Sequence, residues 1–205
     1  MAFDSEALKQ QIPYYLTADP AKRELINQLS LLSKGADKGY FIPRSSDPNL
    51  GEVLQGDCWT GFQILSFKSG NRKLISGIVL SNTCDVSPDN QRTLPPNVTF
   101  APIVKVSKLK SRFESLGLQS LQIAAKLDAI KSQSVTSIFY LPADGPFDEP
   151  HAVLLDDIHS MPINILAANS QKLLTLSMAG FYLFVFKLSV HFCRLQENVD
   201  RSPHL

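Results

Sequence analysis

The sequence contains little cysteine, and its arrangement suits neither disulfides nor zinc. Cys58, Cys84 and Cys193 are the only cysteines in 205 residues, an odd number without a C-x-x-C pair. Zinc sites usually use closely spaced chelating pairs, and secreted domains use an even set of thiols. The opening MAFDSEALKQQ also lacks the basic region and apolar core of a signal peptide. We therefore expect a reducing, cytoplasmic setting and no cofactor.

Net charge is almost absent as well. Twenty Lys and Arg residues face nineteen Asp and Glu residues, which leaves a formal charge of +1. No overall field would therefore attract the protein to nucleic acid or to an anionic membrane, and any such contact needs a local basic patch. The apolar share of 44% is typical of a folded domain and excludes a disordered or collagen-like chain.

The sequence also lacks an uninterrupted apolar run long enough to span a membrane. The longest tract extends from Leu173 to Val190, but Ser177 and Lys187 interrupt it and His191 follows it. A spanning helix needs ~20 apolar residues with few charges. We interpret the tract as part of a core helix and expect no membrane association.

The first part of the chain is predicted to be a helical arm over residues 1–42. Asp19-Pro20 is typical of a helix start, and Gly35 is typical of a helix end. Between them, apolar residues recur at helical spacing, at Leu25, Ile26, Leu29 and Leu32. Turn-forming residues follow Ile42, so we place the boundary with a β-rich core, residues 43–205, at this point.

Two runs between Asp57 and Asp85 predict a β-hairpin. WTGFQILSFK and KLISGIVLSNT are rich in β-branched and aromatic residues, and Gly70-Asn71 lies between them. Gly-Asn can adopt the positive φ of a two-residue turn. Both faces carry apolar side chains, which indicates cover on both sides. Gly61 and Gly77 suit a strong bend, a close backbone approach or a β-bulge, as at the corners of a small barrel.

The remaining pattern predicts further strands and two helical segments. The expected strands cover residues 98–106, 137–141, 152–155 and 161–166. A helical insertion is expected over 107–133, and one long apolar helix over 170–198. This last helix offers more apolar surface than one small sheet covers, so we expect a homodimer or a protein partner that docks through residues 173–190.

Acids and thiols are predicted to meet at the open end of the hairpin. A two-residue turn at Gly70-Asn71 places Asp57 opposite Cys84 on the paired strand. Directly opposed residues have Cβ atoms ~4.5–5.5 Å apart. The side chains that would converge there and that could take part in catalysis or metal binding are Asp57, Cys58, Cys84 and Asp85.

Three interpretations of this cluster remain open. A metal-dependent hydrolase would use Asp57, Cys84, Asp85 and His191. A cysteine nucleophile would need His191 as a base within reach of Cys84. In the structural alternative, the two carboxylates accept hydrogen bonds from turn amides and the thiols pack as small apolar groups.

Basic residues gather in two separate runs. The first lies at the hairpin tip and the second follows the strand expected at 98–106. Phosphate contacts require such groups, although charged runs are also common on solvated faces. We therefore expect RNA or DNA binding through five residues: Lys68, Arg72, Lys73, Lys105 and Lys108.

A succession of short motifs between residues 50 and 106 resembles the PemK/MazF-type toxins. Gly56-Asp57-Cys58-Trp59 is similar to their Gly-Asp strand start, residues 77–81 to their "VLS" strand, and residues 99–103 to their "APIT"-like strand. The family folds as a small SH3-like barrel, and its toxins cleave RNA. Its catalytic residues usually include an Arg between the first two strands and a Thr or Ser in the third. Here Arg72 lies in a shorter connection, and Val104 follows Pro102-Ile103.

Together these features predict an α+β protein with a twisted, antiparallel SH3-like β-barrel, flanking helices and a long apolar C-terminal helix. The expected function is a non-catalytic recognition module related to the PemK/MazF barrels, binding nucleic acid or a protein partner. The resemblance implies a bacterial toxin–antitoxin or phage-defence system. The first alternative is an endoribonuclease, with Arg72 stabilising the scissile phosphate and Asp57 or Asp85 transferring protons.

Overall fold

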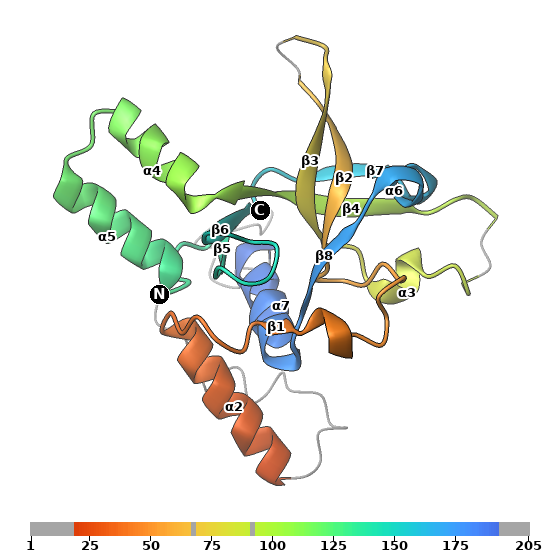
Figure 1. The fold of residues 1–205 in the computed structure, drawn as a ribbon, viewed down its shortest axis with the longest axis horizontal. Coiled ribbons are helices and arrows are strands. Elements are labelled where there is room, and N and C mark those ends of the chain that lie inside the picture. The colour runs from red at the N-terminus through yellow and green to blue at the C-terminus, as the bar shows by residue number, and fades with distance from the viewer. Residues whose placement is uncertain (1–18, 67–68, 91–92, 193–205) are drawn as a thin grey trace, which may run out of the picture.

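The computed structural model describes residues 19–66, 69–90 and 93–192, which form a mixed α+β fold (Figure 1). The helices are α2 (Asp19–Ser33), the short 3₁₀ helix η1 (Arg44–Ser46), α3 (Thr83–Val86), α4 (Val106–Ser115), α5 (Ser120–Lys131), α6 (Ile163–Asn169) and α7 (Met178–Phe192). The strands are β1 (Phe41–Ile42), β2 (Cys58–Leu65), β3 (Arg72–Val79), β4 (Asn97–Lys105), β5 (Ile138–Leu141), β6 (His151–Leu154), β7 (His159–Pro162) and β8 (Lys172–Leu176).

The eight strands form an antiparallel sheet that remains open. Their order is β1-β8-β2-β3-β4-β6-β5, and β7 also pairs with β4. A barrel requires the two edge strands to pair, and among the described residues β1 and β5 do not. The expected closed SH3-like barrel is therefore wrong, whereas the α+β class is confirmed. The physical reason is β4, which pairs first with β7 and then with β6, so the sheet branches there.

Apolar side chains cover both faces of the β2–β3 hairpin at its base, whereas Leu65 and Leu74 in its outer part are exposed, so the expected cover on both sides is confirmed only in part. Cys58 and Ile78 belong to the larger core cluster, which also contains residues of α2 and α7. Trp59 and Phe62 belong to a smaller cluster on the opposite face. These two residues share a face because the strand register shifts between them, and Gly61, with φ +84°, lies inside the shift. Of the options left open for Gly61, the structure therefore shows the β-bulge.

The predicted C-terminal helix over residues 170–198 is wrong in extent and length. Its first part is strand β8, and α7 begins only at Met178 and ends at Phe192. Ser177 separates the two elements: its backbone N–H donates to the Tyr40 carbonyl, and its Oγ accepts from the Gly180 N–H at 3.1 Å. A side chain that caps a helix start favours the break at this position. Residues 193–198 lie outside the described part of the chain.

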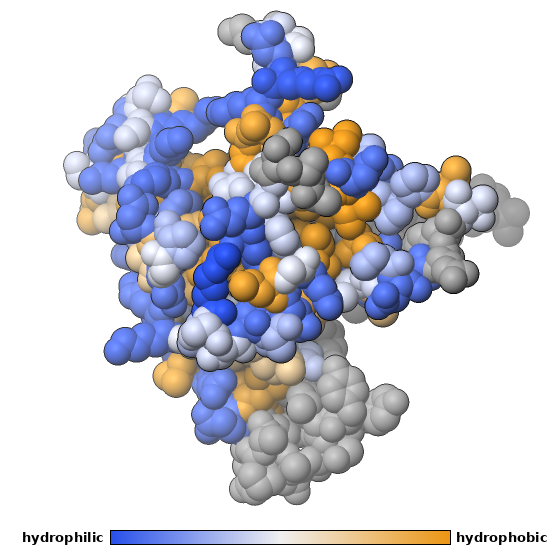
Figure 2. Space-filling model, turned by 45° about the vertical axis from the view of Figure 1, so that its right-hand side comes forward, coloured by the Kyte–Doolittle hydropathy of each residue, from blue (hydrophilic) through white to orange (hydrophobic). Residues whose placement is uncertain are grey.

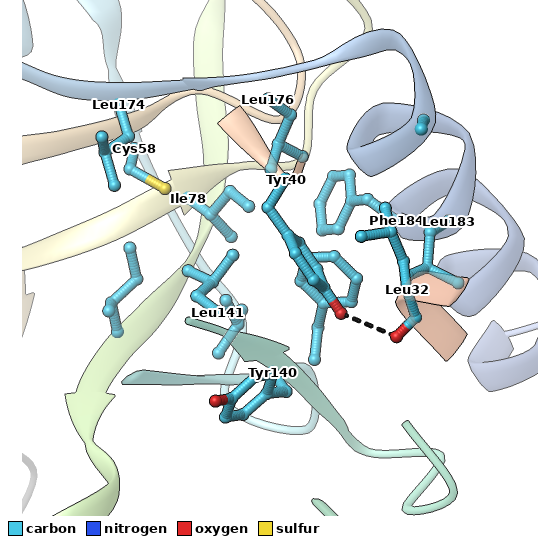
Figure 3. Packing of buried hydrophobic residues seen from close by; sticks show 14 of the residues in the cluster. Leu32, Tyr40, Cys58, Ile78, Tyr140, Leu141, Leu174, Leu176, Leu183 and Phe184 are labelled. Atoms are coloured by element: carbon cyan, nitrogen blue, oxygen red, sulfur yellow. Dashed lines mark hydrogen bonds between the residues drawn. The ribbon is translucent and has the colours of Figure 1, made fainter. Parts of the chain in front are cut away.

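Helix α7 packs its apolar face against this chain's own core. Leu183 and Phe184 are buried in the cluster that also contains Leu29 and Leu32 of α2. Figure 3 shows Tyr40 beside these side chains, with its hydroxyl donating to the Leu32 carbonyl at 3.1 Å. The apolar surface that led us to expect a partner at residues 173–190 is therefore largely covered within the chain. Dimerisation itself stays a prediction.

Other elements follow the predictions in part. The predicted helix is present as α2, which is described from Asp19 and is followed by Gly35 with φ +86°, as expected for a helix end. The expected helical insertion contains two helices, α4 and α5, separated at Gly117 with φ +78°. The strand expected over 161–166 is wrong, because β7 ends at Pro162 and α6 follows.

The division of the chain at residue 42 also stays a prediction. Residues 1–18 lie outside the described part, and β1 is paired with β8. None of the helices in the described ranges has the length and apolarity needed to cross a membrane.

Candidate nucleic-acid interface

The outer part of the β2–β3 hairpin extends beyond the rest of the sheet (Figure 1). Strand β3 pairs with β4 only through residues 77–79, so residues 72–76 pair with β2 alone. We call residues 63–76 the arm. The sequence has no Asp or Glu between Trp59 and Cys84, whereas the arm contains Lys68, Arg72 and Lys73. The arm is therefore a basic projection without internal carboxylates to neutralise it.

The point where β3 leaves β4 is defined by a glycine and a proline. Gly77 pairs with Pro102, and Pro102 has no N–H to donate to a continuing ladder. A Cβ atom at Gly77 would lie 2.7 Å from Phe62 Cδ2 and 3.0 Å from the Ala101 carbonyl oxygen, so the backbone here needs glycine. These two residues position the arm at an angle to β4.

A groove of about 380 Å³ lies between the arm and β4. We call it the fork groove. Lys73 of β3, Lys105 of β4 and Lys108 of α4 all line it. One carboxylate, Asp157, also lines it. Much of the remaining lining is apolar and consists of Ile64, Leu74, Ile75, Pro102, Ile103, Val104, Phe147 and Leu154. Three of the five basic residues selected from the sequence are thus brought to one concave surface.

The charges of the fork groove differ in how far they are neutralised. Lys105 Nζ lies 2.9 Å from Asp148 Oδ1 and 3.2 Å from Glu149 Oε1. These carboxylates, Asp148 first, raise the pKa of Lys105 above its ordinary value. Within the described ranges, neither Lys73 nor Lys108 lies within 4.0 Å of a carboxylate oxygen. These two lysines are therefore the cations available to an incoming anion.

His151 forms a neutral part of the groove wall. Its ring stacks on Phe147 with centroids 4.1 Å apart, and its Nδ1 lies 2.7 Å from the Glu149 carbonyl oxygen. Burial lowers the pKa of His151 below its ordinary value. The imidazole is therefore uncharged at neutral pH, so the lysines supply the positive charge of the groove.

Asp57, the acid most strongly indicated by the sequence, is placed away from this groove. Its side chain is 1% exposed, and its Oδ2 lies 2.8 Å from Lys172 Nζ and 3.0 Å from the Leu54 N–H that donates to it. Burial raises the pKa of the Asp57 carboxyl despite the neighbouring lysine. Asp57 therefore has the features of a structural ion pair that joins the start of β2 to β8.

A second carboxylate completes this buried polar cluster. Asp47 Oδ2 accepts a 2.6 Å hydrogen bond from Thr175 Oγ1 and lies 3.6 Å from Lys172 Nζ. Burial opposes ionisation of Asp47, but the hydrogen bonds from Thr175 and the Asn49 N–H outweigh it, so its pKa is lowered. Lys172 also donates to the Asn49 carbonyl at 2.7 Å. The cluster anchors the loop between β1 and β2.

The cluster lies beside another groove of about 470 Å³, next to the outer edge of β8. Arg44 lines it, and its guanidinium donates to the Lys172 carbonyl at 2.8 Å. Sequence reasoning identified Asp57 but not Asp47 or Lys172. Lys172 stands at the edge of an apolar run, directly after Ser170-Gln171, so the local sequence carried no signal that this cation would be buried with acidic partners.

The predicted meeting of acids and thiols does not occur. Cys58 pairs with Ile78, so the expected register that opposed Asp57 and Cys84 is wrong. The turn is longer than two residues, because Leu65 already pairs with Arg72. Cys84 and Asp85 lie in the short helix α3, where both are exposed.

The residues of the two enzymatic alternatives are also not gathered in one place. Arg72 and Asp57 lie at opposite ends of the hairpin, roughly 25 Å apart at ~3.3 Å per strand residue. His191 lies in the last turn of α7. Over the described ranges, no three His, Cys, Asp or Glu side chains are close enough to share a metal ion. Lys68 and Cys193 lie outside the described residues.

Comparison with known proteins identifies no family for this chain, so its function is argued from the geometry of the site. Neither a scan against protein-family models nor a search of the curated proteins finds a match to this chain.

Proposed function

We propose that this protein is a non-catalytic recognition module that binds nucleic acid through the fork groove and the basic arm. The observation that supports this function best is the convergence of Lys73, Lys105 and Lys108 on one concave surface. These lysines come from three different elements. Phosphate binding by a protein of nearly neutral net charge requires such a local concentration of cations.

The arrangement of partners supports a polyanion in particular. Lys73 and Lys108 are exposed and have no carboxylate within ion-pair distance in the described part, and Arg72 is exposed on the opposite face of the arm. A line of cations along a projecting arm and a groove matches a chain of regularly spaced phosphates. Asp148 and Glu149 hold Lys105, so we expect its contribution to be smaller than that of Lys73.

Kinship with the PemK/MazF family forms part of this proposal. Pro102 and Ile103, at the end of the "APIT"-like segment, and Val104 after it line the fork groove together with Lys73. On this proposal the chain keeps the location of a nucleic-acid site while Val104 stands where the family usually has a Thr or Ser. A bacterial toxin–antitoxin or phage-defence system is the corresponding biological context.

Direct binding measurements test the proposal. The full chain is titrated into short fluorescein-labelled RNA and DNA, single-stranded and duplex, and anisotropy is recorded at several salt concentrations. We expect salt-sensitive binding, and a weakening of roughly tenfold for Lys73→Glu/Lys108→Glu, with a salt slope reduced by about 0.9 for each phosphate that the variant no longer neutralises. The matched control is Lys34→Glu/Lys110→Glu, which makes the same charge change at exposed lysines outside the groove.

Equal weakening by the control pair, or absence of salt-sensitive binding, would overturn the proposed interface. Cleavage of the RNA probe would instead favour the endoribonuclease alternative, provided that Arg72→Ala abolishes it. Retention of intact probe under conditions where it is bound supports recognition without catalysis.

A further inference from the structure

The arm carries two exposed leucines whose role neither the core nor the lysines explain. Leu65 is 50% exposed and Leu74 is 64% exposed, whereas most large apolar side chains of this sheet are buried. Exposing apolar side chains on a projecting element is unfavourable in water. Neighbouring apolar side chains of this kind often mark a contact surface.

The strand register places both leucines on one face of the arm. Gln63 pairs with Leu74, and Leu65 pairs with Arg72, so these four side chains share a face. The opposite face carries Phe62, Ile64, Lys73 and Ile75. Of these, Phe62 is fully buried, and Ile64 and Ile75 pack against the smaller core cluster. The leucine face therefore points away from the core, and it holds Arg72 next to Leu65.

The charge around the leucines indicates the kind of partner. Residues 63–76 contain three basic and no acidic residues. Figure 2 shows hydrophilic residues around the projecting end of the molecule, with hydrophobic residues between and beneath them. An apolar pair flanked by cations is complementary to a nucleic-acid duplex, which presents phosphates on its surface and apolar base faces when a stacked step opens.

We infer that Leu65 and Leu74 form a wedge that inserts between stacked base pairs of a duplex while Arg72, on the same face of the arm, contacts a flanking phosphate. This inference rests on the proposed nucleic-acid binding. A two-stranded ribbon is narrow enough to enter a groove of a duplex, and leucine is among the side chains that open base steps. Binding through the wedge would therefore open or bend the duplex as well as attach the protein to it.

The experiment measures binding and base unstacking separately. A duplex containing 2-aminopurine near its centre becomes more fluorescent when that base loses its stacking partner. The full chain is added until anisotropy of a second label shows saturation. We expect the 2-aminopurine signal to rise at least twofold with the wild type. In Leu65→Ser/Leu74→Ser, with the protein again added until the anisotropy is saturated, we expect that rise to be lost.

A matched pair of substitutions controls for the loss of exposed leucine. Leu116 is 66% exposed and Leu121 is 82% exposed, and both lie at the α4–α5 connection outside the arm. Leu116→Ser/Leu121→Ser should leave both signals unchanged. Circular dichroism confirms that each variant is folded, as expected for substitutions at exposed positions.

The outcomes separate this inference from the proposed function. Absence of anisotropy change with the wild type contradicts nucleic-acid binding itself. Saturated binding without a 2-aminopurine response, or a response that survives in the arm variant, overturns only the wedge. A dimer in sedimentation that dissociates in Leu65→Ser/Leu74→Ser would show that a second copy covers the leucines, which also overturns it.

Discussion

Lys172 and Lys187, the buried lysines among the residues that the structure describes, differ in what surrounds their charge. Lys172 has a side chain 3% exposed, and its Nζ contacts the carboxylate of Asp57 at 2.8 Å. Lys187 is 5% exposed, and its Nζ donates to the backbone carbonyl of Gln133. One ammonium group therefore has a full counter-charge, whereas the partner of the other is a neutral dipole.

This difference shows that burial alone does not decide what a charge does to stability. Desolvation disfavours any buried ammonium, and it lowers the pKa of Lys187 to about 8. In the Lys172 cluster two carboxylates share the cation, so removal of Lys172 leaves both carboxylates without a cation, whereas removal of one carboxylate leaves Lys172 paired with the other. Lys172 thus anchors the loop before β2. The buried charge of Lys187, by contrast, lowers the stability of the folded state at its position in α7.

The largest expected effect is the loss of Lys172. Lys172→Met leaves Asp57 and Asp47 buried without a cation, and breaking a buried pair costs about 3–5 kcal/mol. We expect this decrease in the free energy of unfolding, measured by urea denaturation at pH 7. The matched control is Lys110→Met at an exposed site, which should change stability by no more than about 0.5 kcal/mol. Equal losses of stability in Lys172→Met and Lys110→Met would show that the buried ion pairs of Lys172 do not stabilise the fold.

Asp57→Asn should have a smaller effect than Lys172→Met. Lys172 keeps Asp47 and the Asn49 carbonyl as partners, and the amide oxygen of the new side chain can still accept from Leu54. Loss of one hydrogen bond between charged groups costs about 2–3 kcal/mol. In a double-mutant cycle with Lys172→Met, the two losses should be less than additive. Additive losses would show that the two residues do not interact.

The difference in unfolding free energy between the wild type and Lys187→Met should rise by about 2 kcal/mol between pH 8 and pH 10. The folded pKa of Lys187 is about 8, below the ordinary value of 10.5, so the unfolded chain binds more protons at this position in this window. Burial raises the pKa of Cys58, Tyr40 and Tyr140, which has the opposite effect once these groups ionise in the unfolded chain, so the wild-type profile alone combines both signs. Urea titrations of both proteins from pH 7 to pH 11 give the difference. A difference that does not change with pH would remove the special status of Lys187.

The smallest expected change is a gain of stability in Lys187→Met. At pH 7 the substitution removes a buried charge, but it leaves the Gln133 carbonyl without its donor, so the net stabilisation should be only about 1 kcal/mol. The stability of the variant should fall steadily above pH 8, because the raised pKa values of Cys58, Tyr40 and Tyr140 remain and that of Lys187 is gone. A destabilised variant whose pH profile runs parallel to that of the wild type would show that Lys187 does not titrate in that window.

Local patterns predicted much of the fold and part of the site. The helix at Asp19–Ser33, the β2–β3 hairpin and the bulge at Gly61 all follow from spacing, turn residues and β-propensity. Strand β8 was not predicted, because the apolar run Leu173–Leu176 continues into α7. The break at Ser177 depends on the hydrogen bond that its side chain accepts from the Gly180 N–H. Hairpin register failed because the turn includes more residues than Gly70-Asn71.

The sequence by itself determined that this chain has an acid-free basic hairpin and an acid, Asp57, at its base. These properties depend on neighbours in the chain and can be read from composition and spacing. Only the tertiary structure decided that Asp57 pairs with Lys172 and that Lys73 shares a groove with Lys105 and Lys108. The pairing of β2 with β8 and the parting of β3 from β4 determine those contacts. Both depend on packing between distant segments, which no local pattern encodes.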